Sequence, residues 1–376
     1  MSITPTIAAC LMVRNEAAFL DACLQSLDGQ VDSIYVTDTG SIDDSIAVAK
    51  SHNAVIRSFP WGNDFAHARN ASIAEVAEDW IITLDADDLF PPGEAARLRR
   101  HLEANACAAT VRYAVQSGYT SVRAWKILRN RRGAHFEGAI HESLSTWLNE
   151  CRRAGLPLQD TDIQLIHTGY VSQALPGKVA RNLPLLEAEW KRTGPSAVER
   201  RFQIGADLGL ALAHDNRSAE ACVFLENLLG ELASIQVHTS LPPAASLQAL
   251  INLLWILSER KDAATAIAWT RKLEQILGSS AVYQLHRGLQ EFASGNFAAA
   301  IQWLQRFAQS PNPDTFEVPI REEYLGVGLW RIVGQCHMGL HEYQEAAESF
   351  QRCSRLEPGN PEHELRRFVA TRIMPE

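Results

Sequence analysis

The sequence predicts an N-terminal α/β domain built on a mostly parallel sheet, followed by an all-α domain of helical repeats. Short apolar runs alternate with helical stretches in the first half, and β-branched alternation disappears from about Pro176 onward. The helical half contains an internal repeat. At 376 residues the chain also exceeds the length at which one core usually stops growing. We therefore expect two domains, residues 1–175 and 176–376.

The first four strands and the helices between them have the order of a doubly wound sheet. Apolar runs predict strands at Ile7–Val13, Ile34–Thr37, Val55–Ile56 and Trp80–Leu84. Helical spacing of apolar residues predicts helices at Asn15–Leu27, Ile42–Lys50, Phe65–Ala77 and Glu94–Ala104. Strands at Ala108–Val115, Ser121–Leu128 and Ile163–His167 are expected to form a second, more antiparallel part of the sheet.

Polar clusters follow three of these strands. Asn15-Glu16, Asp38 to Ser41 and Asp85 to Asp88 each stand directly after an apolar run. In open α/β sheets ligands bind beyond the carboxyl ends of the strands, so these clusters should meet on one rim. The sequence therefore predicts a ligand site there.

The repeat of the second half is clearest at its C-terminal end. Trp330, Val333, Gly334, Tyr343, Ala346, Phe350, Cys353 and Pro358 match the spacing of a tetratricopeptide repeat. A second copy passes through Gly288, Gly295, Phe297, Ala300, Leu304 and Phe307. Weaker copies pass through Gly209, Asn216, Ala221 and Leu225, and through Leu253, Lys261, Ala266 and Leu273. Four units fit the available length.

Composition and charge exclude several classes of protein. The net charge of −9 argues against a nucleic-acid partner, because such proteins normally present a basic face. The apolar run at Ile7–Val13 is too short for a signal peptide or a membrane span. Seven scattered cysteines without a CxxC pair fit reduced thiols. We expect a cytoplasmic protein.

Asp85 and Asp87 form the first candidate site. Two carboxylates at i and i+2 leaving a strand can point at one Mg²⁺ or Mn²⁺ ion that also binds a diphosphate. An acidic turn that caps the next helix explains the same residues equally well. Their place after Trp80–Leu84 favours the metal site.

Three further groups are weaker candidates on composition alone. Arg69, on the first turns of a helix, can pair with phosphate, with Asn70 fixing its geometry, or can lie on a solvated face. His167 can join a carboxylate as a third ligand of Mn²⁺, or can be a structural residue at a strand end. His141-Glu142 can supply a general base, or can lie on the surface.

Four stretches resemble the successive motifs of family 2 glycosyltransferases: Leu11 to Glu16, Val36 to Asp43, Trp61 to Asn70 and Asp79 to Asp87. More narrowly, a series of five ordered motifs is similar to a bacterial branch that carries tetratricopeptide repeats and includes peptide S- and O-glycosyltransferases of glycopeptide bacteriocins. The five are Val13 to Glu16, Asp38 to Asp43, Trp61 to Asn70, Ile140-His141-Glu142 and His167-Thr168-Gly169-Tyr170. The motifs span roughly residues 7–170, and the repeats extend the resemblance over most of the chain.

The resemblance implies a GT-A fold and a role for each matching residue. Val13, Arg14, Asn15, Glu16 and Asp38 would hold the nucleobase and ribose of a nucleoside-diphosphate sugar, here a UDP-sugar, and Arg69 would contact the nucleotide. Asp85 and Asp87 match the DxD motif, with Asp87 and His167 as ligands of Mn²⁺ or Mg²⁺. Glu142 would deprotonate the acceptor, His141 would line the pocket, and Asp88 is the rival base. Some relatives carry an acidic residue at the position of Thr37. Its absence here leaves the preferred nucleobase of the donor open.

The resemblance also implies inversion at the sugar carbon and a peptide or protein acceptor bound by the repeats. The repeats can alternatively build a homodimer, and the acceptor can alternatively be a glycan or lipid. A non-catalytic scaffold that binds a protein partner is the rival class of function. Retention of Arg69, Asp85, Asp87 and His167 argues against it.

Overall fold

The computed structural model describes residues 4–103, 105–115, 117–169, 175–234, 244–310 and 316–373. The chain divides into two compact units. The first contains residues 1–117 and 121–189, and the second contains residues 118–120 and 190–376. The boundary expected at residues 175 and 176 stays a prediction. Tyr170, the last residue of the fifth motif, lies outside the described residues.

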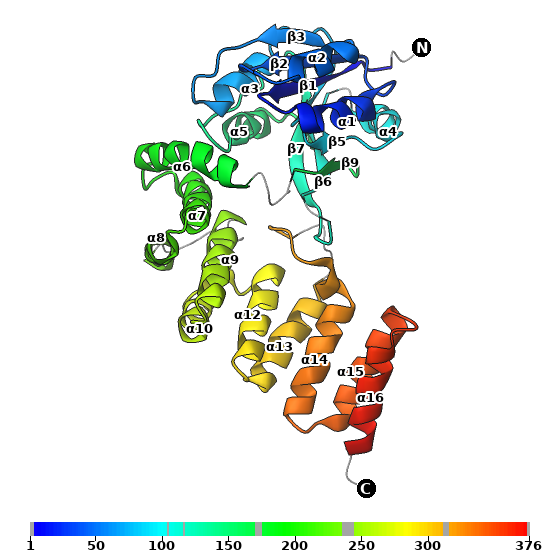
Figure 1. Cartoon of the computed structure of the whole chain (residues 1–376), viewed down its shortest axis with the longest axis vertical. Coiled ribbons are helices and arrows are strands. Elements are labelled where there is room, and N and C mark those ends of the chain that lie inside the picture. The colour runs from blue at the N-terminus through cyan, green and yellow to red at the C-terminus, as the bar shows by residue number, and fades with distance from the viewer. Residues whose placement is uncertain are drawn as a thin grey trace. The chain divides into compact units, whose positions relative to one another are not determined.

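The first unit is built on one mixed sheet of strand order β3-β2-β1-β4-β7-β6-β9-β5, with β8 paired to β6 (Figure 1). Its parallel half contains β1 (Ile7–Val13), β2 (Ser33–Asp38), β3 (Val55–Ser58) and β4 (Trp80–Leu84). The antiparallel half begins where β7 (Val122–Arg129) pairs with β4 and with β6 (Ala108–Ala114). The predicted fold class, including the change from parallel to antiparallel pairing, is confirmed.

Two short strands close the far edge of the sheet. β5 (Asp88–Leu89) pairs antiparallel with β9 (Gln164–His167), and Asp88 stands opposite His167. β8 (Leu158–Gln159) runs parallel to β6. The two-residue strand β5 has no signal of its own in the sequence, because it is too short to show a period. It nevertheless joins the end of the predicted metal motif to the His-containing strand.

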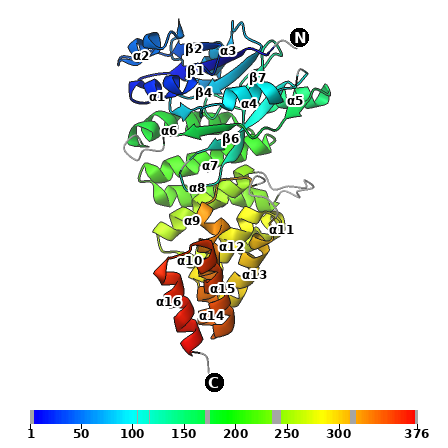
Figure 2. The same cartoon turned by 90° about the vertical axis from the view of Figure 1, so that its right-hand side faces the viewer.

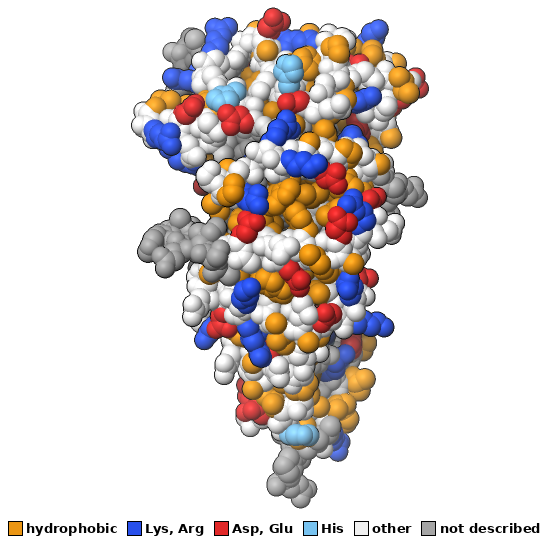
Figure 3. All heavy atoms as spheres, turned by 90° about the vertical axis from the view of Figure 1, so that its left-hand side faces the viewer, with side chains coloured by type: hydrophobic (Ala, Val, Ile, Leu, Met, Phe, Trp, Pro, Cys, Tyr) orange, Lys and Arg blue, Asp and Glu red, His pale blue; other side chains and the backbone are white. Residues whose placement is uncertain are grey.

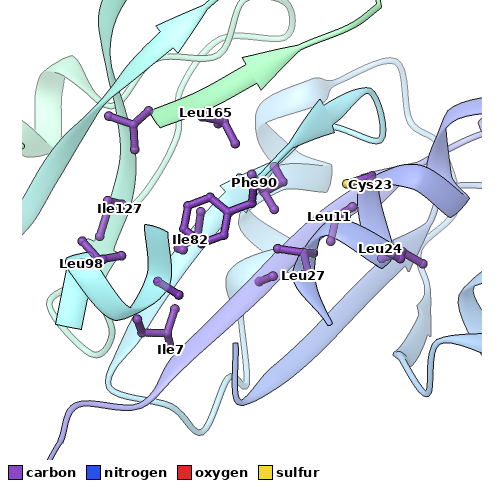
Figure 4. Close-up of a cluster of buried hydrophobic side chains, with 14 of the residues drawn as sticks. Ile7, Leu11, Cys23, Leu24, Leu27, Ile82, Phe90, Leu98, Ile127 and Leu165 are labelled. Atoms are coloured by element: carbon purple, nitrogen blue, oxygen red, sulfur yellow. The ribbon is translucent and has the colours of Figure 1, made fainter. Parts of the chain in front are cut away.

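Helices cover both faces of the sheet, and the side chains of β1 alternate between them. Odd-numbered positions of β1 pack against α1 (Ala17–Leu27), α2 (Ser45–Ser51) and α4 (Glu94–His101), in the core of Figure 4. The even positions Ala8 and Cys10 pack against α3 (Phe65–Ile73) and α5 (Ser145–Arg153). α6 (Leu175–Arg192) is the last helix to contribute to this unit.

Helix α3 ends four residues before the sequence predicts. The expected range reached Ala77, but the helix stops at Ile73, and Ala74 is already extended with ψ 152°. Glu75 then has a positive φ of 55°. The chain turns here because Val76 is buried in the second core while Glu75 faces solvent.

The second unit consists of helix pairs in sequence order (Figure 2). The described helices are α7 (Val198–His214), α8 (Ser218–Ser234), α9 (Ala244–Glu259), α10 (Ala263–Lys272), α11 (Glu274–Leu277), α12 (Ala281–Ala293), α13 (Phe297–Ala308), η3 (Glu322–Leu325), α14 (Val327–Gly339), α15 (Tyr343–Leu356) and α16 (Pro361–Ile373). Tyr119 also belongs to this unit and forms a bridge with Arg321.

The same small details recur in four helix pairs of this unit. The turn between paired helices contains a residue with positive φ, five positions before a buried alanine of the second helix: Asn216 and Ala221, Lys261 and Ala266, Gly295 and Ala300, His341 and Ala346. In three pairs a glycine of the first helix lies against a large side chain of the second: Gly209 and Leu225, Gly288 and Leu304, Gly334 and Phe350. These recurrences confirm the tetratricopeptide-like repeats.

The surface carries charges of both signs. On the face drawn in Figure 3, Lys and Arg side chains are interspersed with Asp and Glu side chains. Within the described ranges, no helix combines the length and the apolar character that crossing a bilayer requires.

Candidate active site

A cavity of about 260 Å³ lies in the first unit, beyond the carboxyl ends of β1 and β4. Residues that the sequence had singled out make up half of its lining: Glu16, Arg69, Asp85, Asp87, His141, Glu142 and His167. The others are Met12, Phe65, Ala86, Ile140, Lys178, Arg181 and Asn182. Side chains from motifs more than 150 positions apart therefore share one space, and their chemical roles remain predictions.

Helix α3 fixes one wall of this cavity through Arg69. The buried guanidinium donates from Nη2 to Asp85 Oδ1 at 2.5 Å, from Nε to Glu142 Oε1 at 3.1 Å and from Nη1 to the Leu84 carbonyl at 3.1 Å. Burial alone would lower the pKa of Arg69, but the two carboxylates outweigh it and raise the pKa. Arg69 is thus a permanent cation that holds two carboxylates in place.

Asn70 has a different task from the one expected. Its amide does not bond to Arg69. It donates from Nδ2 to the Phe136 carbonyl at 2.9 Å and accepts from the Phe136 N–H at 2.8 Å. The Phe65 N–H bonds to the Ala139 carbonyl at 2.9 Å. Helix α3 therefore holds the loop that carries His141 and Glu142.

The loop of residues 136–144 presents Glu142 to the cavity. Glu137 and Ser143 form an antiparallel bridge across it, and His141 takes a positive φ of 51° at its tip. The Glu142 side chain is 14% exposed and receives Arg69 on Oε1. Among the described residues no hydrogen bond to Oε2 is recorded. A carboxylate held by one oxygen beside a cavity can accept a proton on the other.

The three aspartates of residues 85–88 have three different environments. Asp85 lies between Arg69 and Lys126, whose Nζ is 3.1 Å from Asp85 Oδ2. Burial would raise the pKa of Asp85, but the two cations lower it well below the ordinary range. Asp88 is fully buried and receives the Asp85 N–H on Oδ2 at 2.9 Å and the Tyr113 hydroxyl on Oδ1 at 2.7 Å. It does not line the cavity.

Asp87 is held more loosely than its neighbours. Its carboxylate oxygens lie 3.4 Å from His167 Nδ1 and 3.6 Å from Lys178 Nζ, both longer than an ordinary hydrogen bond. Burial and the nearby charge of Asp85 raise the pKa of Asp87, against the opposing effect of His167. Glu16, across the cavity, also has a raised pKa, because of burial and the charge of Asp87.

Asp87, Asp88 and His167 offer one ligand atom each within 4.8 Å of one another. The sequence had grouped Asp85, rather than Asp88, with Asp87 and His167. The pKa of His167 is raised, since the hydrogen bond from its ring to Asp88 and the charge of Asp87 outweigh burial. Two carboxylates and an imidazole suit a hard or borderline divalent cation such as Mn²⁺. Lys178 already places a positive charge beside Asp87.

The residues expected to hold the nucleobase and ribose lie at the ends of β1 and β2. Val13 and Asp38 are paired neighbours in the sheet. Asp38 accepts the N–H groups of Gly40 and Ser41 at 3.2 and 3.0 Å, and the Asn15 side chain accepts the Ile42 N–H at 2.8 Å. Of this group only Glu16 is in the cavity lining; Val13, Arg14, Asn15 and Asp38 are not.

Sequence reasoning missed Tyr113, Lys126, Lys178 and Arg181. Lys126 had a signal, because a lysine inside the apolar run of β7 needs buried carboxylates as partners. Lys178 and Arg181 also had one, since they stand three apart on a helix and share a face. Tyr113 had none: only the pairing of β6 with β9 brings it to Asp88 and His167.

The comparisons with known proteins agree with this fold. Residues 9–154 match the model of glycosyl transferase family 2. A TPR repeat-containing protein of Synechococcus elongatus is 38% identical over 139 residues, which are 36% of this chain and 34% of that protein. The SPbeta prophage-derived glycosyltransferase SunS of Bacillus subtilis is 28% identical over 219 residues, 56% of this chain and 50% of SunS. The matches thus cover between a third and half of these relatives.

Among solved structures, glucosyl-3-phosphoglycerate synthase from Mycobacterium tuberculosis, in complex with Mn²⁺, uridine diphosphate and glucosyl-3-phosphoglycerate, matches with a TM-score of 0.37 and 16% identity. The match covers 49% of this chain and 78% of that one. The family model, the two relatives and the four repeat pairs agree. Residues 9–154 of the N-terminal unit thus resemble family 2 glycosyltransferases, and tetratricopeptide-like repeats follow them.

Proposed function

We propose that the chain is a metal-dependent, inverting glycosyltransferase that moves a sugar from a UDP-sugar to a side chain of a peptide or protein. One observation carries the proposal: Asp87 and Glu142 line the same cavity of about 260 Å³. Asp87 is a loosely held carboxylate suited to binding a metal ion, and Glu142 is a carboxylate suited to proton transfer. Both reactants can thus meet between them.

Asp87 and His167 are the proposed protein ligands of Mn²⁺ or Mg²⁺, and Asp88 orients His167 from behind. The bound ion would neutralise charge on the diphosphate as the sugar departs. For Asp85 we propose a positioning role rather than a metal-binding one, because Arg69 and Lys126 already occupy both of its carboxylate oxygens. The proposed site for the uridine consists of Val13, Arg14, Asn15, Glu16 and Asp38.

Glu142 is the proposed general base. It takes the acceptor proton on its unbonded oxygen while the acceptor atom forms a bond to the sugar carbon and the nucleoside diphosphate leaves from the opposite side. The full burial of Asp88 and its bonds to Tyr113, His167 and the Asp85 N–H favour Glu142 over Asp88 for this step. His141 is proposed to contact the acceptor from the tip of the same loop.

The repeats are the proposed acceptor-binding part, because repeat arrays bind extended peptides along their inner surface. A glycan or lipid acceptor would use the same two carboxylates. Peptide, glycan and lipid acceptors can be separated by incubating the protein with each class and a panel of radiolabelled nucleotide sugars.

A thermal-shift panel tests the donor side. UDP, GDP and dTDP, each with and without Mn²⁺, are compared, and a ligand at about 100 times its Kd adds roughly 2.7 kcal/mol of stability. We expect a shift with UDP only when Mn²⁺ is present. The absence of any shift with every nucleotide would contradict the proposal.

Two variants test the assigned roles. We expect Asp87→Asn to lose the Mn²⁺-dependent shift and to reduce transfer by at least about a hundredfold while it keeps the fold. We expect Glu142→Gln to keep the shift and to reduce transfer by about 10²–10⁴-fold. Asp44→Asn, at an exposed aspartate outside the cavity, is the control and should change neither quantity.

A further inference from the structure

Two classes of basic side chain lie around the cavity: Arg69, Lys178 and Arg181 line it, and Lys126 contacts the lining residue Asp85. Arg69 and Lys126 come from α3 and β7, are largely buried, and each bonds to two carboxylates. Lys178 and Arg181 come from one face of α6. Lys178 has only a long ion pair with Asp87, and Arg181 forms no ion pair with a described carboxylate, so their charges are available to something that enters the cavity.

Lys178 lies on Asp87 without forming a tight pair. Its Nζ is 3.6 Å from Asp87 Oδ2 and 3.3 Å from the Gly169 carbonyl, and its side chain is 42% exposed. A lysine ammonium sits on a flexible stem and can leave such a position at little cost. The place that it occupies is next to the carboxylate oxygen that a divalent cation would use.

Gly169 keeps this carboxylate oxygen in its position. A Cβ on Gly169 would lie 1.7 Å from Asp87 Oδ2, so the oxygen fills the space that a side chain would take. Thr168 donates its N–H and its hydroxyl to the Asp87 carbonyl, both at 2.8 Å. The backbone of residues 168 and 169 therefore holds the Asp87 carboxylate next to Lys178.

Arg181 extends the basic face along α6. Its guanidinium carbon lies 5.4 Å from the centre of the Phe65 ring, and its Nε donates to Asn182 Oδ1 at 2.9 Å. Within the described ranges no carboxylate forms an ion pair with it. Phe65 and Asn182 hold the guanidinium beside the cavity while leaving donors for an anion.

We propose that Lys178 is a tethered cation that neutralises Asp87 until a divalent metal ion binds there, and that it then moves, beside Arg181, onto the diphosphate of the donor. The proposal rests on the proposed function, because it needs a metal ion and a nucleoside diphosphate in this cavity. It assigns α6 to the donor site.

Removing the Lys178 charge should have opposite effects on the two ligands. A positive charge near Asp87 repels an incoming cation, so Lys178→Gln should bind Mn²⁺ alone about three to ten times more tightly. The same variant loses a charge-assisted contact to phosphate, so its affinity for UDP at saturating Mn²⁺ should fall about tenfold or more. A purely structural lysine would not give opposite signs.

The experiment measures Mn²⁺ binding by electron paramagnetic resonance of the free ion, and UDP binding by calorimetry, on the full chain. Lys178→Arg keeps the charge and should restore most of the UDP affinity. Arg181→Gln should weaken UDP binding but leave Mn²⁺ affinity nearly unchanged, since Arg181 makes no ion pair with Asp87. Lys191→Gln, an exposed lysine near the end of α6, is the matched control and should alter neither affinity.

The outcomes separate this proposal from the one on which it rests. If the unmodified protein binds UDP with Mn²⁺ but Lys178→Gln binds Mn²⁺ no more tightly, the tethered-cation proposal is overturned and the proposed function stands. If neither the unmodified protein nor Lys178→Gln binds Mn²⁺ detectably in the absence of UDP, the tethered-cation proposal is likewise overturned. If the unmodified protein binds none of UDP, GDP and dTDP with Mn²⁺ or Mg²⁺, the proposed function itself fails.

Discussion

Among the described residues, each unit contains one deeply buried arginine, and the two have similar partners. Arg69 in the first unit is 6% exposed and pairs with Asp85 at 2.5 Å; Arg287 in the second is 4% exposed and pairs with Glu291 at 2.5 Å. Glu291 is itself 1% exposed and also receives Asn296 and Arg271. Asp85 and Glu142 instead line a cavity. Burial and ion pairing alone therefore do not mark a functional site.

The difference lies in what surrounds the remaining carboxylate oxygens. In the second unit the Glu291 carboxylate is enclosed by Arg271, Arg287 and Asn296, which come from α10, α12 and the turn before α13. In the first unit Lys126 takes the second oxygen of Asp85, but Glu142 is held by Arg69 on Oε1 and lines the cavity. Variants of both arginines, and of residues around Asp87, can test this distinction.

The largest effect is expected for Arg69→Met. The change leaves Asp85 with Lys126 alone and removes the recorded ion pair of Glu142, so we expect the free energy of unfolding to fall by about 3–5 kcal/mol. Transfer should also be lost, because neither carboxylate keeps its position. Urea unfolding and a transfer assay measure the two quantities. Normal transfer at unchanged stability would contradict the comparison.

For Arg287→Met we expect a loss of stability without a loss of ligand binding. Glu291 would keep Arg271 and Asn296 but lose its buried cation, so unfolding should become easier by about 3 kcal/mol. Calorimetric titration of the folded variant with UDP and Mn²⁺ should give affinities within about twofold of the unmodified protein. Loss of nucleotide binding by a variant that is still folded would remove the distinction between the two clusters.

Gly169→Ala should show the reverse of Arg287→Met, namely weaker metal binding with little loss of stability. The new methyl group would lie 1.7 Å from Asp87 Oδ2, so the carboxylate must rotate away. The Cβ would also lie 2.6 Å from Asp87 Cγ, so the whole side chain must turn, and we expect about 1 kcal/mol of lost stability but a 10–100-fold weaker affinity for Mn²⁺. Gly230→Ala, whose Cβ meets open space, is the control. Unchanged Mn²⁺ affinity in Gly169→Ala would show that the orientation of Asp87 is unimportant.

The smallest effect is expected for Tyr113→Phe. Asp88 would lose one hydrogen bond of 2.7 Å but keep His167, Lys126 and the Asp85 N–H, so stability should fall by about 1 kcal/mol. Thermal unfolding measures this change. A loss above about 3 kcal/mol would mean that the hydroxyl supports the whole cluster rather than one carboxylate.

Much of the fold followed from the sequence because its signals are local. The run Trp80–Leu84 is a strand with the predicted bounds, and the turns at Asn216 and Gly295 stand where the repeat spacing requires them. Such local signals do not show which distant strands pair or in what register. The strand at Asp88–Leu89 and the approach of Tyr113 to His167 depend on register across the antiparallel half of the sheet.

The candidate site divides along the same line. Asp87 was singled out by its place after a strand, and Arg69, Glu142 and His167 chiefly by the resemblance of their motifs to family 2 glycosyltransferases; all four line the cavity. The supporting side chains, such as Lys126, were missed because their partners are more than 35 positions away in sequence. That Asn70 holds the Phe136 backbone instead of Arg69 could not be seen either, since a loop conformation decides it.

The adjacent positions of Arg69 and Asn70 on α3 have a consequence for how the proposed transferase could change its substrates. One short helix holds both Asp85 and the loop that carries Glu142. A substitution that shifted the helix would displace both at once. Diversification is therefore expected to spare these two positions and to accumulate in side chains that reach the cavity from outside this framework.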